Sequence, residues 1–213
     1  MSTYLTLTEV ANLALDHIGE PYLAAYESDS GVTAEAVRLH LPMAVNTILE
    51  GHVWSFATRI AELSLTSDEV PEDPSWTACY DLPSDCLRVI KVNGVDVDVP
   101  ENFFVIRGRY LLLAEEPDEG PLIDYITDEA DVEDWPATFI DAVSHLLASK
   151  LAPKLAQDQA MATGQLQLHD LALGKARSKD ARETRSNENS GPRKLAARSS
   201  LVNARYGPNH PPY

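Results

Sequence analysis

The stretch LEGHVWSFA, Leu49 to Ala57, marks the point at which the sequence changes from a helical to a β pattern. Upstream of it, apolar side chains recur every three or four residues, which is the spacing of one helix face. This stripe consists of Val37, Leu41, Val45 and Ile48. Gly51 follows it and is a typical helix end. From Trp54 onward larger and smaller side chains alternate, so we expect the chain to pass from helix to sheet within this stretch.

The sequence before this stretch predicts two helices. Thr6 and Glu9 have the spacing of a capping box, in which each side chain bonds to the backbone of the other residue. The first apolar stripe then runs to Gly19 and Pro21, which are expected to end the helix. Pro42 lies inside the second helical stripe. We expect a kink or a break there, because the proline ring removes a donor and crowds the preceding turn.

Short β-like runs follow one another between residues 54 and 127. Asn93-Gly94 is a strong signal for a tight hairpin, since both residues tolerate a positive φ angle. Gly108 indicates a second turn between two apolar runs. This middle region therefore predicts a small antiparallel sheet.

Helical periodicity resumes near Pro136, a favourable residue for the first turn of a helix. We therefore predict an α+β protein, with a bundle of N- and C-terminal helices, an inserted small antiparallel β domain and an extended C-terminal arm. The predicted helices cover residues 6–18, 33–50, 136–155 and 158–185. The predicted domains are residues 1–53 with 128–185 for the bundle, 54–127 for the β insertion and 186–213 for the arm.

Charge is distributed unevenly along the chain. Residues 1–174 contain 8 Lys and Arg against 30 Asp and Glu, whereas residues 175–213 contain 9 against 3. The body is thus strongly acidic and the C-terminal part basic. The acidic body is expected to repel nucleic acid, although such a charge is also typical of an ordinary solvated surface.

Sequence motifs for catalysis or metal binding are lacking. The six histidines are scattered, and the sequence contains no HExxH, GxSxG, Walker A or dinucleotide-binding pattern. Cys79 and Cys86 lack the spacing of a redox or zinc motif. Asp68 and Glu69 are adjacent carboxylates, but such pairs are expected by chance among 33 acidic residues. We therefore predict a protein that is not an enzyme and that holds no metal and no cofactor.

Two further groups of residues have a structural interpretation that outweighs a functional one. Arg107 and Arg109 flank Gly108 at a predicted hairpin tip, where two solvated guanidinium groups are more expected than a phosphate site. Trp54 and Phe56 are expected to anchor the core between helix and sheet rather than to stack on a ligand.

The N-terminal stretch MSTYLTLTEV has neither a basic region nor an apolar region of a signal peptide. We expect a protein that is neither secreted by a standard signal nor embedded in a membrane.

Five motifs follow one another along residues 5–185. They are IGEP (18–21), LEGHVWSFA (49–57), LPSDCLRVIKV (82–92), RGRYLL (107–112) and DVEDWPATFIDAV (131–143). In order and spacing they resemble the tail tubular protein A family, the head-to-tail adaptors of short-tailed bacteriophages. The sequence departs from the family pattern at Tyr22, at Val53 and in its basic C-terminal end.

The resemblance implies a dodecameric ring at the head–tail junction of a virion, assembled in the host cytoplasm. One side of the ring would dock on the portal protein and the other on the tail nozzle protein. DNA would pass through the lumen without sequence-specific binding, and an acidic lining would let it slide because basic side chains would hold its phosphates. The resemblance implies no membrane partner.

Two other classes of protein remain open on the sequence. An acidic regulatory or DNA-mimic binding protein would explain the charge of the body but gives the basic arm no role. A hydrolase with surface carboxylates would require a pocket of perturbed titratable groups.

The arm has too few apolar residues to form a core of its own, so we expect it to lie on a partner, either the portal or a neighbouring subunit. Its basic side chains can meet a row of carboxylates, while its aliphatic and aromatic side chains fill shallow apolar pockets. The predicted partner-binding residues are Arg193, Lys194, Leu195, Arg198, Leu201, Arg205, Tyr206 and Tyr213.

Truncation after Arg185 should leave the bundle folded but abolish stable joining to the portal. Tyr206→Ala should weaken joining more than Arg193→Ala does, because an exposed ion pair contributes only about 0–1 kcal/mol. Co-sedimentation with portal-containing heads measures both effects. The arm would be dispensable if heads joined the truncated protein and retained DNA as well as heads joined to the full chain do.

Overall fold

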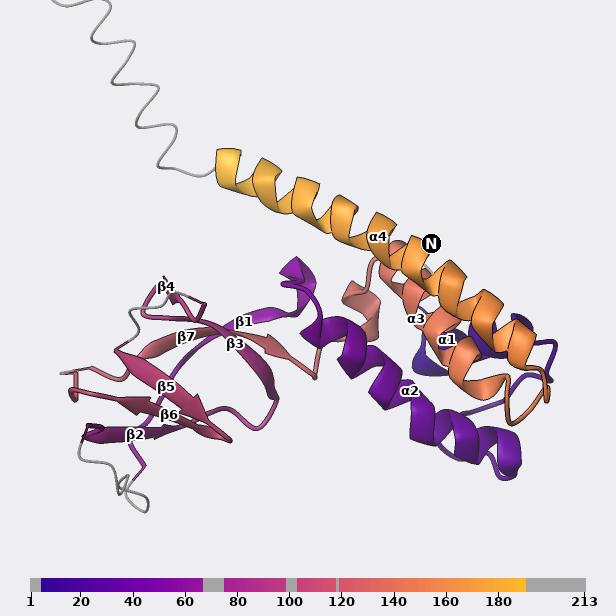
Figure 1. The fold of residues 1–213 in the computed structure, drawn as a ribbon, viewed down its shortest axis with the longest axis horizontal. Coiled ribbons are helices and arrows are strands. Elements are labelled where there is room, and N and C mark those ends of the chain that lie inside the picture. The colour runs from indigo at the N-terminus through magenta and orange to yellow at the C-terminus, as the bar shows by residue number, and fades with distance from the viewer. Residues whose placement is uncertain (1–4, 67–74, 99–102, 118, 191–213) are drawn as a thin grey trace, which may run out of the picture.

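The computed structural model describes residues 5–66, 75–98, 103–117 and 119–190, and it describes no side chains from residue 186 onward. A group of helices lies beside a group of strands, and the long C-terminal helix runs along one edge of the helical part (Figure 1). The helices are α1 (Leu7–Asp16), α2 (Val32–Glu50), α3 (Ala137–Leu151) and α4 (Gln159–Ser190). The predicted α+β class is confirmed.

α3 is the central helix of the bundle, because it contacts α1, α2 and α4. Its buried side chains belong to one hydrophobic core that all four helices share. α4 contributes small residues to this core, and the buried ones are Ala162, Ala172 and Ala176. Small side chains at these positions let α3 and α4 pack closely along their length. The N- and C-terminal helices therefore form one bundle, as predicted.

The ends of the helices agree with the sequence signals at most points. Thr6 and Glu9 form both hydrogen bonds of the capping box. Gly19 has φ 73°, which favours glycine after the end of α1. α4 continues to Ser190, five residues beyond the predicted helix end, so the predicted arm begins with helical residues.

Of the kink or break expected at Pro42, the break does not occur. α2 is continuous from Val32 to Glu50 with Pro42 inside it. Pro42 lies on the exposed side of the helix. The carbonyl of Arg38, which loses its donor, therefore faces the solvent side, where water can satisfy it.

The middle of the chain forms two small antiparallel sheets rather than the single sheet predicted. One has the strand order β1-β7-β3-β4 and the other β2-β6-β5. The strands are β1 (Thr58–Glu62), β2 (Ala78–Asp81), β3 (Cys86–Val92), β4 (Val95–Asp96), β5 (Phe104–Arg107), β6 (Tyr110–Leu113) and β7 (Leu122–Thr127). Apolar side chains from both sheets form a second hydrophobic core.

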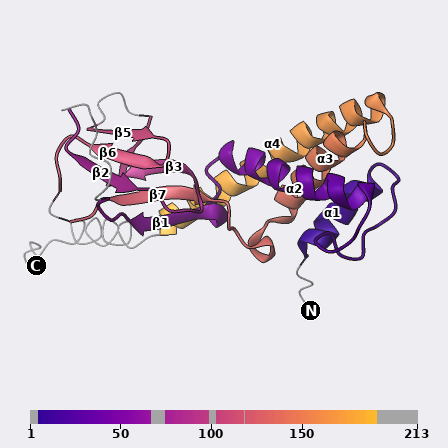
Figure 2. The same ribbon diagram turned by 90° about the horizontal axis from the view of Figure 1, so that it is seen from below.

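Both predicted turns are present. Asn93 and Gly94 have positive φ angles of 49° and 79° between β3 and β4, and Gly108 has φ 60° between β5 and β6. Figure 2 shows the strands grouped at one end of the molecule and the helices at the other. β1 pairs with β7 from Thr58↔Ile126 to Glu62↔Leu122. The chain thus leaves the bundle and returns to it through two adjacent strands.

An aromatic cluster lies where the two parts join. Trp54 is 1% exposed, and its indole nitrogen donates to the carbonyl of Ile48 at 2.9 Å. Its ring meets that of Phe139 edge-on, with centroids 5.1 Å apart. Phe56 and Trp135 also contact Phe139 edge-on. Trp54 and Phe56 are therefore core anchors, as the sequence predicted.

Replacing Trp54 by Ala should lower the free energy of unfolding by about 3–5 kcal/mol, because it opens a cavity at this junction and removes a buried hydrogen bond. Denaturant unfolding measures this change. Ile60→Ala is the matched control, since Ile60 is 71% exposed and should change the free energy by less than about 0.5 kcal/mol. Equal effects of the two substitutions would contradict the role given to Trp54.

Candidate interaction surfaces

The C-terminal half of α4 is fixed to the junction by a buried carboxylate. Asp180 is 5% exposed and accepts hydrogen bonds from the backbone nitrogen and hydroxyl of Ser55, at 3.0 and 2.6 Å. His52 Nε2 lies 3.1 Å from the same carboxylate. Arg177 donates to the carbonyl of Gly51 at 3.0 Å. These contacts hold α4 against the end of α2.

The residues Ser55, His52 and Asp180 include the types used by hydrolases, but their arrangement differs. Both the serine and the histidine bond to the aspartate. A nucleophilic serine instead has to give its proton to the histidine. The geometry therefore serves to orient side chains and to hold two segments together.

A histidine pair joins α1, α3 and α4. The rings of His17 and His145 are stacked with centroids 4.2 Å apart. His17 Nε2 lies 3.1 Å from the hydroxyl of Ser144, and His145 Nδ1 lies 2.7 Å from Gln165 Oε1. Burial and the neighbouring His145 lower the pKa of His17, although Asp141 and Asp16 oppose the shift. The pair is thus packed best when His17 is neutral.

In the described part of the chain, no group of three or more His, Cys, Asp or Glu side chains is arranged to hold a metal ion. Cys79 and Cys86 are buried free thiols. Burial is the main cause that raises the pKa of Cys86 to about 11, so this thiol stays protonated at neutral pH. None of the described helices is both long and apolar enough to cross a membrane.

Two exposed helix faces carry large apolar side chains. On α2, Leu39 is 61% exposed and lies between Val32 and Met43, which are also exposed. The same side of α2 carries the exposed acids Glu35 and Glu50. We call this the α2 face.

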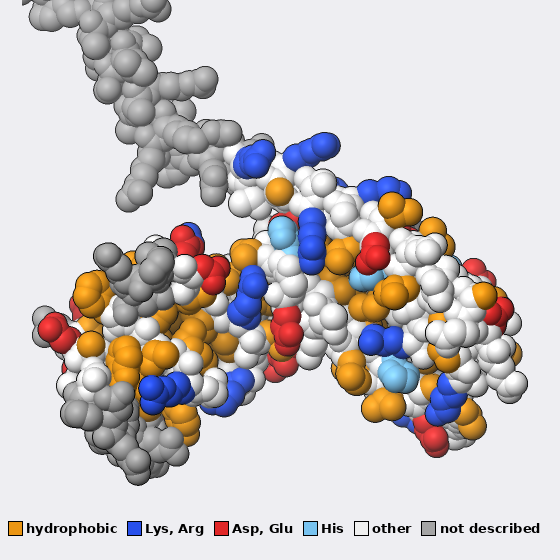
Figure 3. Space-filling model, viewed as in Figure 1, with side chains coloured by type: hydrophobic (Ala, Val, Ile, Leu, Met, Phe, Trp, Pro, Cys, Tyr) orange, Lys and Arg blue, Asp and Glu red, His pale blue; other side chains and the backbone are white. Residues whose placement is uncertain are grey.

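The second surface is the α4 face, defined by exposed residues of the long helix. Its apolar members are Leu168 and Leu171, and its basic members are Lys175, Lys179 and Arg182. Glu183 lies beside them and pairs with Lys179 at 3.8 Å. Leu171 is 64% exposed. A shallow depression follows it toward Arg182. Figure 3 shows Lys and Arg side chains gathered along this helix.

The two faces differ in charge and lie on different helices that flank α3. α3 contacts both α2 and α4, and Figure 1 shows α2 and α4 along opposite edges of the bundle. The α2 face is acidic at its ends, whereas the α4 face is basic in its C-terminal half. The two faces are therefore different from each other and complementary in charge.

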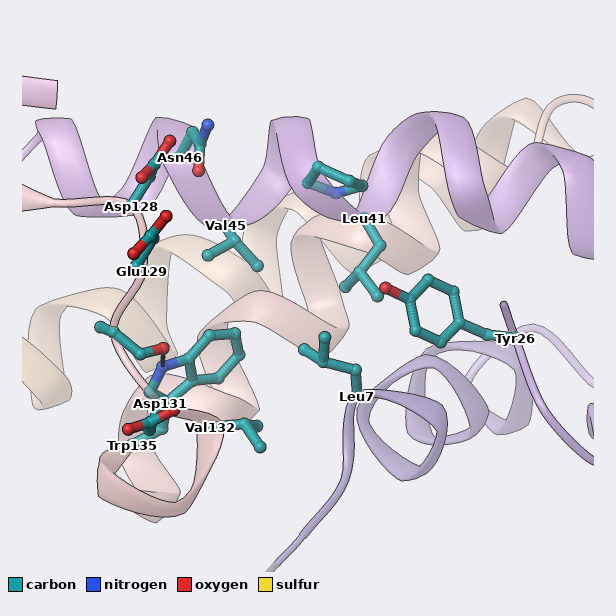
Figure 4. A pocket seen from close by; sticks show the side chains of 12 residues that line it. Leu7, Tyr26, Leu41, Val45, Asn46, Asp128, Glu129, Asp131, Val132 and Trp135 are labelled. Carbon is teal, nitrogen blue, oxygen red and sulfur yellow. Dashed lines mark hydrogen bonds between the residues drawn. The ribbon is translucent and has the colours of Figure 1, made fainter. Parts of the chain in front are cut away.

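A groove lies between α1, α2 and the segment that follows β7. It has a volume of about 500 Å³, and Leu41, Val45 and Trp135 contribute apolar side chains to it. Asp128, Glu129 and Asp131 line it with carboxylates. Figure 4 shows Asp128 and Glu129 beside Asn46 of α2, with Leu7 and Tyr26 at the opposite end. We call this the acidic groove.

The segment that bears these carboxylates is held in place from both ends. At the end of β7, the Thr127 hydroxyl donates to the Asp85 carboxylate at 2.7 Å, and the Asp128 amide donates to the Asp85 carbonyl at 2.9 Å. Further along, the Trp135 indole donates to the carbonyl of Ala130 at 3.1 Å. The position of the acidic rim is thus fixed by the β domain and by the bundle core.

The charged and partner-binding residues that the sequence singled out lie in two kinds of place. All the predicted partner-binding residues lie outside the described residues: Arg193, Lys194, Leu195, Arg198, Leu201, Arg205, Tyr206 and Tyr213. Asp68 and Glu69 lie outside them as well. Arg109 is not simply solvated, because its guanidinium donates to the carbonyls of Leu82, Pro83 and Cys86. It holds the segment before β3 against the β5–β6 hairpin.

Sequence inspection missed both helix faces and the acidic groove. The acids of the run DEADVED, residues 128–134, are exposed around a short helical turn. The signal that could have found the groove is the position of these acids directly before the buried Trp135. Comparison of the chain with models of known protein families found no match, and comparison with curated proteins found none either.

Lowering the pH from about 7.5 to about 5.5 should destabilise the protein partly through His17. The folded state holds the pKa of His17 below its ordinary value of 6.5, so the unfolded chain binds the proton first. The stability contribution of this group is therefore present above about pH 6.5 and lost as the pH falls below it. Thermal denaturation should show a smaller fall in Tm for His17→Gln than for the parent protein, and equal falls would contradict this assignment.

Proposed function

We propose that this protein is a head-to-tail adaptor of a short-tailed bacteriophage, which forms a ring between the portal and the tail nozzle and lines part of the DNA exit channel. The observation that carries the proposal is the pair of unlike, complementary helix faces on α2 and α4. When two copies meet through two different surfaces, the contact is heterologous. Repetition of such a contact closes into a ring when the rotation between copies allows it. A dodecamer is the ring that the family resemblance implies.

The contacts available to the two faces support a heterologous interface. Leu39 and Met43 of one copy can pack on Leu168 and Leu171 of the next, which removes exposed apolar surface from water. Glu50 on the α2 face is opposite in charge to Lys175 and Arg182 on the α4 face. The apolar contacts supply most of the affinity and the charges set the direction of assembly.

The remaining parts of the proposal come from the charge distribution and from the order of the motifs. An acidic body suits a conduit through which a polyanion must slide, because it does not replace the counterions of DNA. The chemistry of this protein then consists of subunit and partner contacts, without a catalytic step. Portal and nozzle are the partners, and the virion head–tail junction is the location.

Leu171→Glu should convert ring-sized particles into monomers of 23.4 kDa, because it places a carboxylate in the centre of the apolar contact. Mass photometry of the full chain, alone and with purified portal, measures this change. Val95→Glu is the matched control, since Val95 is also an exposed apolar residue but lies in the β domain. A parent protein that stays monomeric even on the portal would contradict the proposal.

A mixing experiment tests the direction of the interface. The variant Leu39→Glu lacks a competent α2 face, and Leu171→Glu lacks a competent α4 face. Mixed together, they retain one intact contact and should form dimers but no rings. If the two variants stay monomeric when mixed, while each alone has lost the ring, the interface does not pair α2 with α4.

A further inference from the structure

The acidic groove has the chemistry of a site for a basic peptide with apolar anchors. Its floor offers the apolar side chains of Leu41, Val45 and Trp135, and its rim offers the carboxylates of Asp128, Glu129 and Asp131. The three acids are exposed. Among the described residues, none of these carboxylates has a cation within 4.0 Å or a hydrogen-bond donor. An occupant that supplies positive charge would relieve their mutual repulsion.

One segment of this chain matches that chemistry. Residues 191–213 contain Arg193, Lys194, Arg198 and Arg205 and no Asp or Glu. Leucine and tyrosine side chains alternate with these charges, and Tyr206 directly follows Arg205. A tyrosine ring can fill an apolar depression while its neighbour bonds to a carboxylate at the rim. The groove and the segment are therefore complementary in both charge and apolar character.

α4 ends beyond the bundle to which it belongs (Figure 1). The last anchored residue of the helix is Asp180, which bonds to Ser55. Residues 182–185 are all exposed, and α4 continues beyond them to Ser190. Figure 1 shows this end of the helix extending past the bundle. The 23 residues that follow can span roughly 75 Å at about 3.3 Å each, which is enough to cross to an adjacent molecule.

We propose that the acidic groove of one copy receives residues 191–213 of a neighbouring copy, with Tyr206 on the apolar floor and Arg205 against the carboxylates. This inference rests on the proposed function in requiring that two copies lie side by side. It assigns the arm to a neighbouring subunit rather than to the portal, so the arm supports joining to the portal only by fastening the ring. Each arm then fastens one ring contact that the α2 and α4 faces form, and a closed ring multiplies these modest attachments.

Cross-linking between two different single-cysteine variants of the full chain tests the proposal. Asn46→Cys places a thiol beside the rim, and Tyr206→Cys places one on the arm. The native thiols Cys79 and Cys86 are buried. A short bismaleimide joins two thiols through a thioether to each, so a product that contains both variants forms only between copies. We expect a covalent dimer in the mixture, and Val95→Cys in place of Asn46→Cys should give at least about tenfold less of it, since only the groove holds the arm.

Charge exchange tests the contact itself. Asp131→Lys in the Asn46→Cys chain should reduce the cross-link severalfold, and Arg205→Glu in the Tyr206→Cys chain should restore it. Asp131 makes no side-chain capping bond, so its replacement leaves the local turn intact. The inference would be overturned if Arg205→Glu failed to restore the cross-link, or if Val95→Cys gave as much cross-link as Asn46→Cys. It would also be overturned if a chain that carries both Asn46→Cys and Tyr206→Cys formed a link only within itself.

The same samples separate the inference from the proposed function. Ring-sized particles without the cross-link would overturn the inference and leave the adaptor proposal standing. A cross-link between copies without rings would support the arm contact and contradict the ring. If neither rings nor the cross-link form, both proposals are wrong.

Discussion

The packing of Trp54 against Phe139 is the contact on which the rest of the structure depends. Trp54 ends the first helical block and Phe139 begins the second, and they are separated in sequence by the whole β domain. The hydrogen bond from the indole to the Ile48 carbonyl fixes the ring at the end of α2. Because β1 begins directly after this point and pairs with β7, the same contact sets how the sheets join the bundle.

Polar contacts around this centre position the α4 face and the acidic groove. Asp180 holds α4 against Ser55 and His52, and so determines which side of α4 faces outward. Asp85 holds the end of β7 and so places the acidic rim over α2. Burial opposes ionisation of Asp85, but hydrogen bonds from Thr127 and Tyr125 prevail and lower its pKa. The surfaces are therefore defined by buried or half-buried carboxylates and not only by the exposed side chains on them.

The fold could be predicted further than the site. Apolar periodicity, the capping box at Thr6 and the glycine turns report local geometry, and these predictions are confirmed. The division of the strands into two sheets depends on pairings between distant segments, such as β2 with β6, which no local pattern encodes. Pro42 shows the same limit, because the cost of a helical proline depends on whether the freed carbonyl faces solvent. The groove was missed because its floor and rim come from α2 and from the segment after β7. These segments are distant in sequence and come together only in the tertiary structure.

The insertion of the β domain between the helical blocks has a consequence for synthesis on the ribosome. α1 and α2 emerge early, but α3, the helix that covers their apolar sides, begins only at Ala137. Until then the first two helices expose residues such as Val37 and Ile48, which are buried in the finished bundle. The sheets, whose strands pair within residues 58–127, can form before the bundle closes. Synthesis thus passes through an interval with a formed β domain and an open helical half, when the nascent chain is most exposed to aggregation and to chaperones.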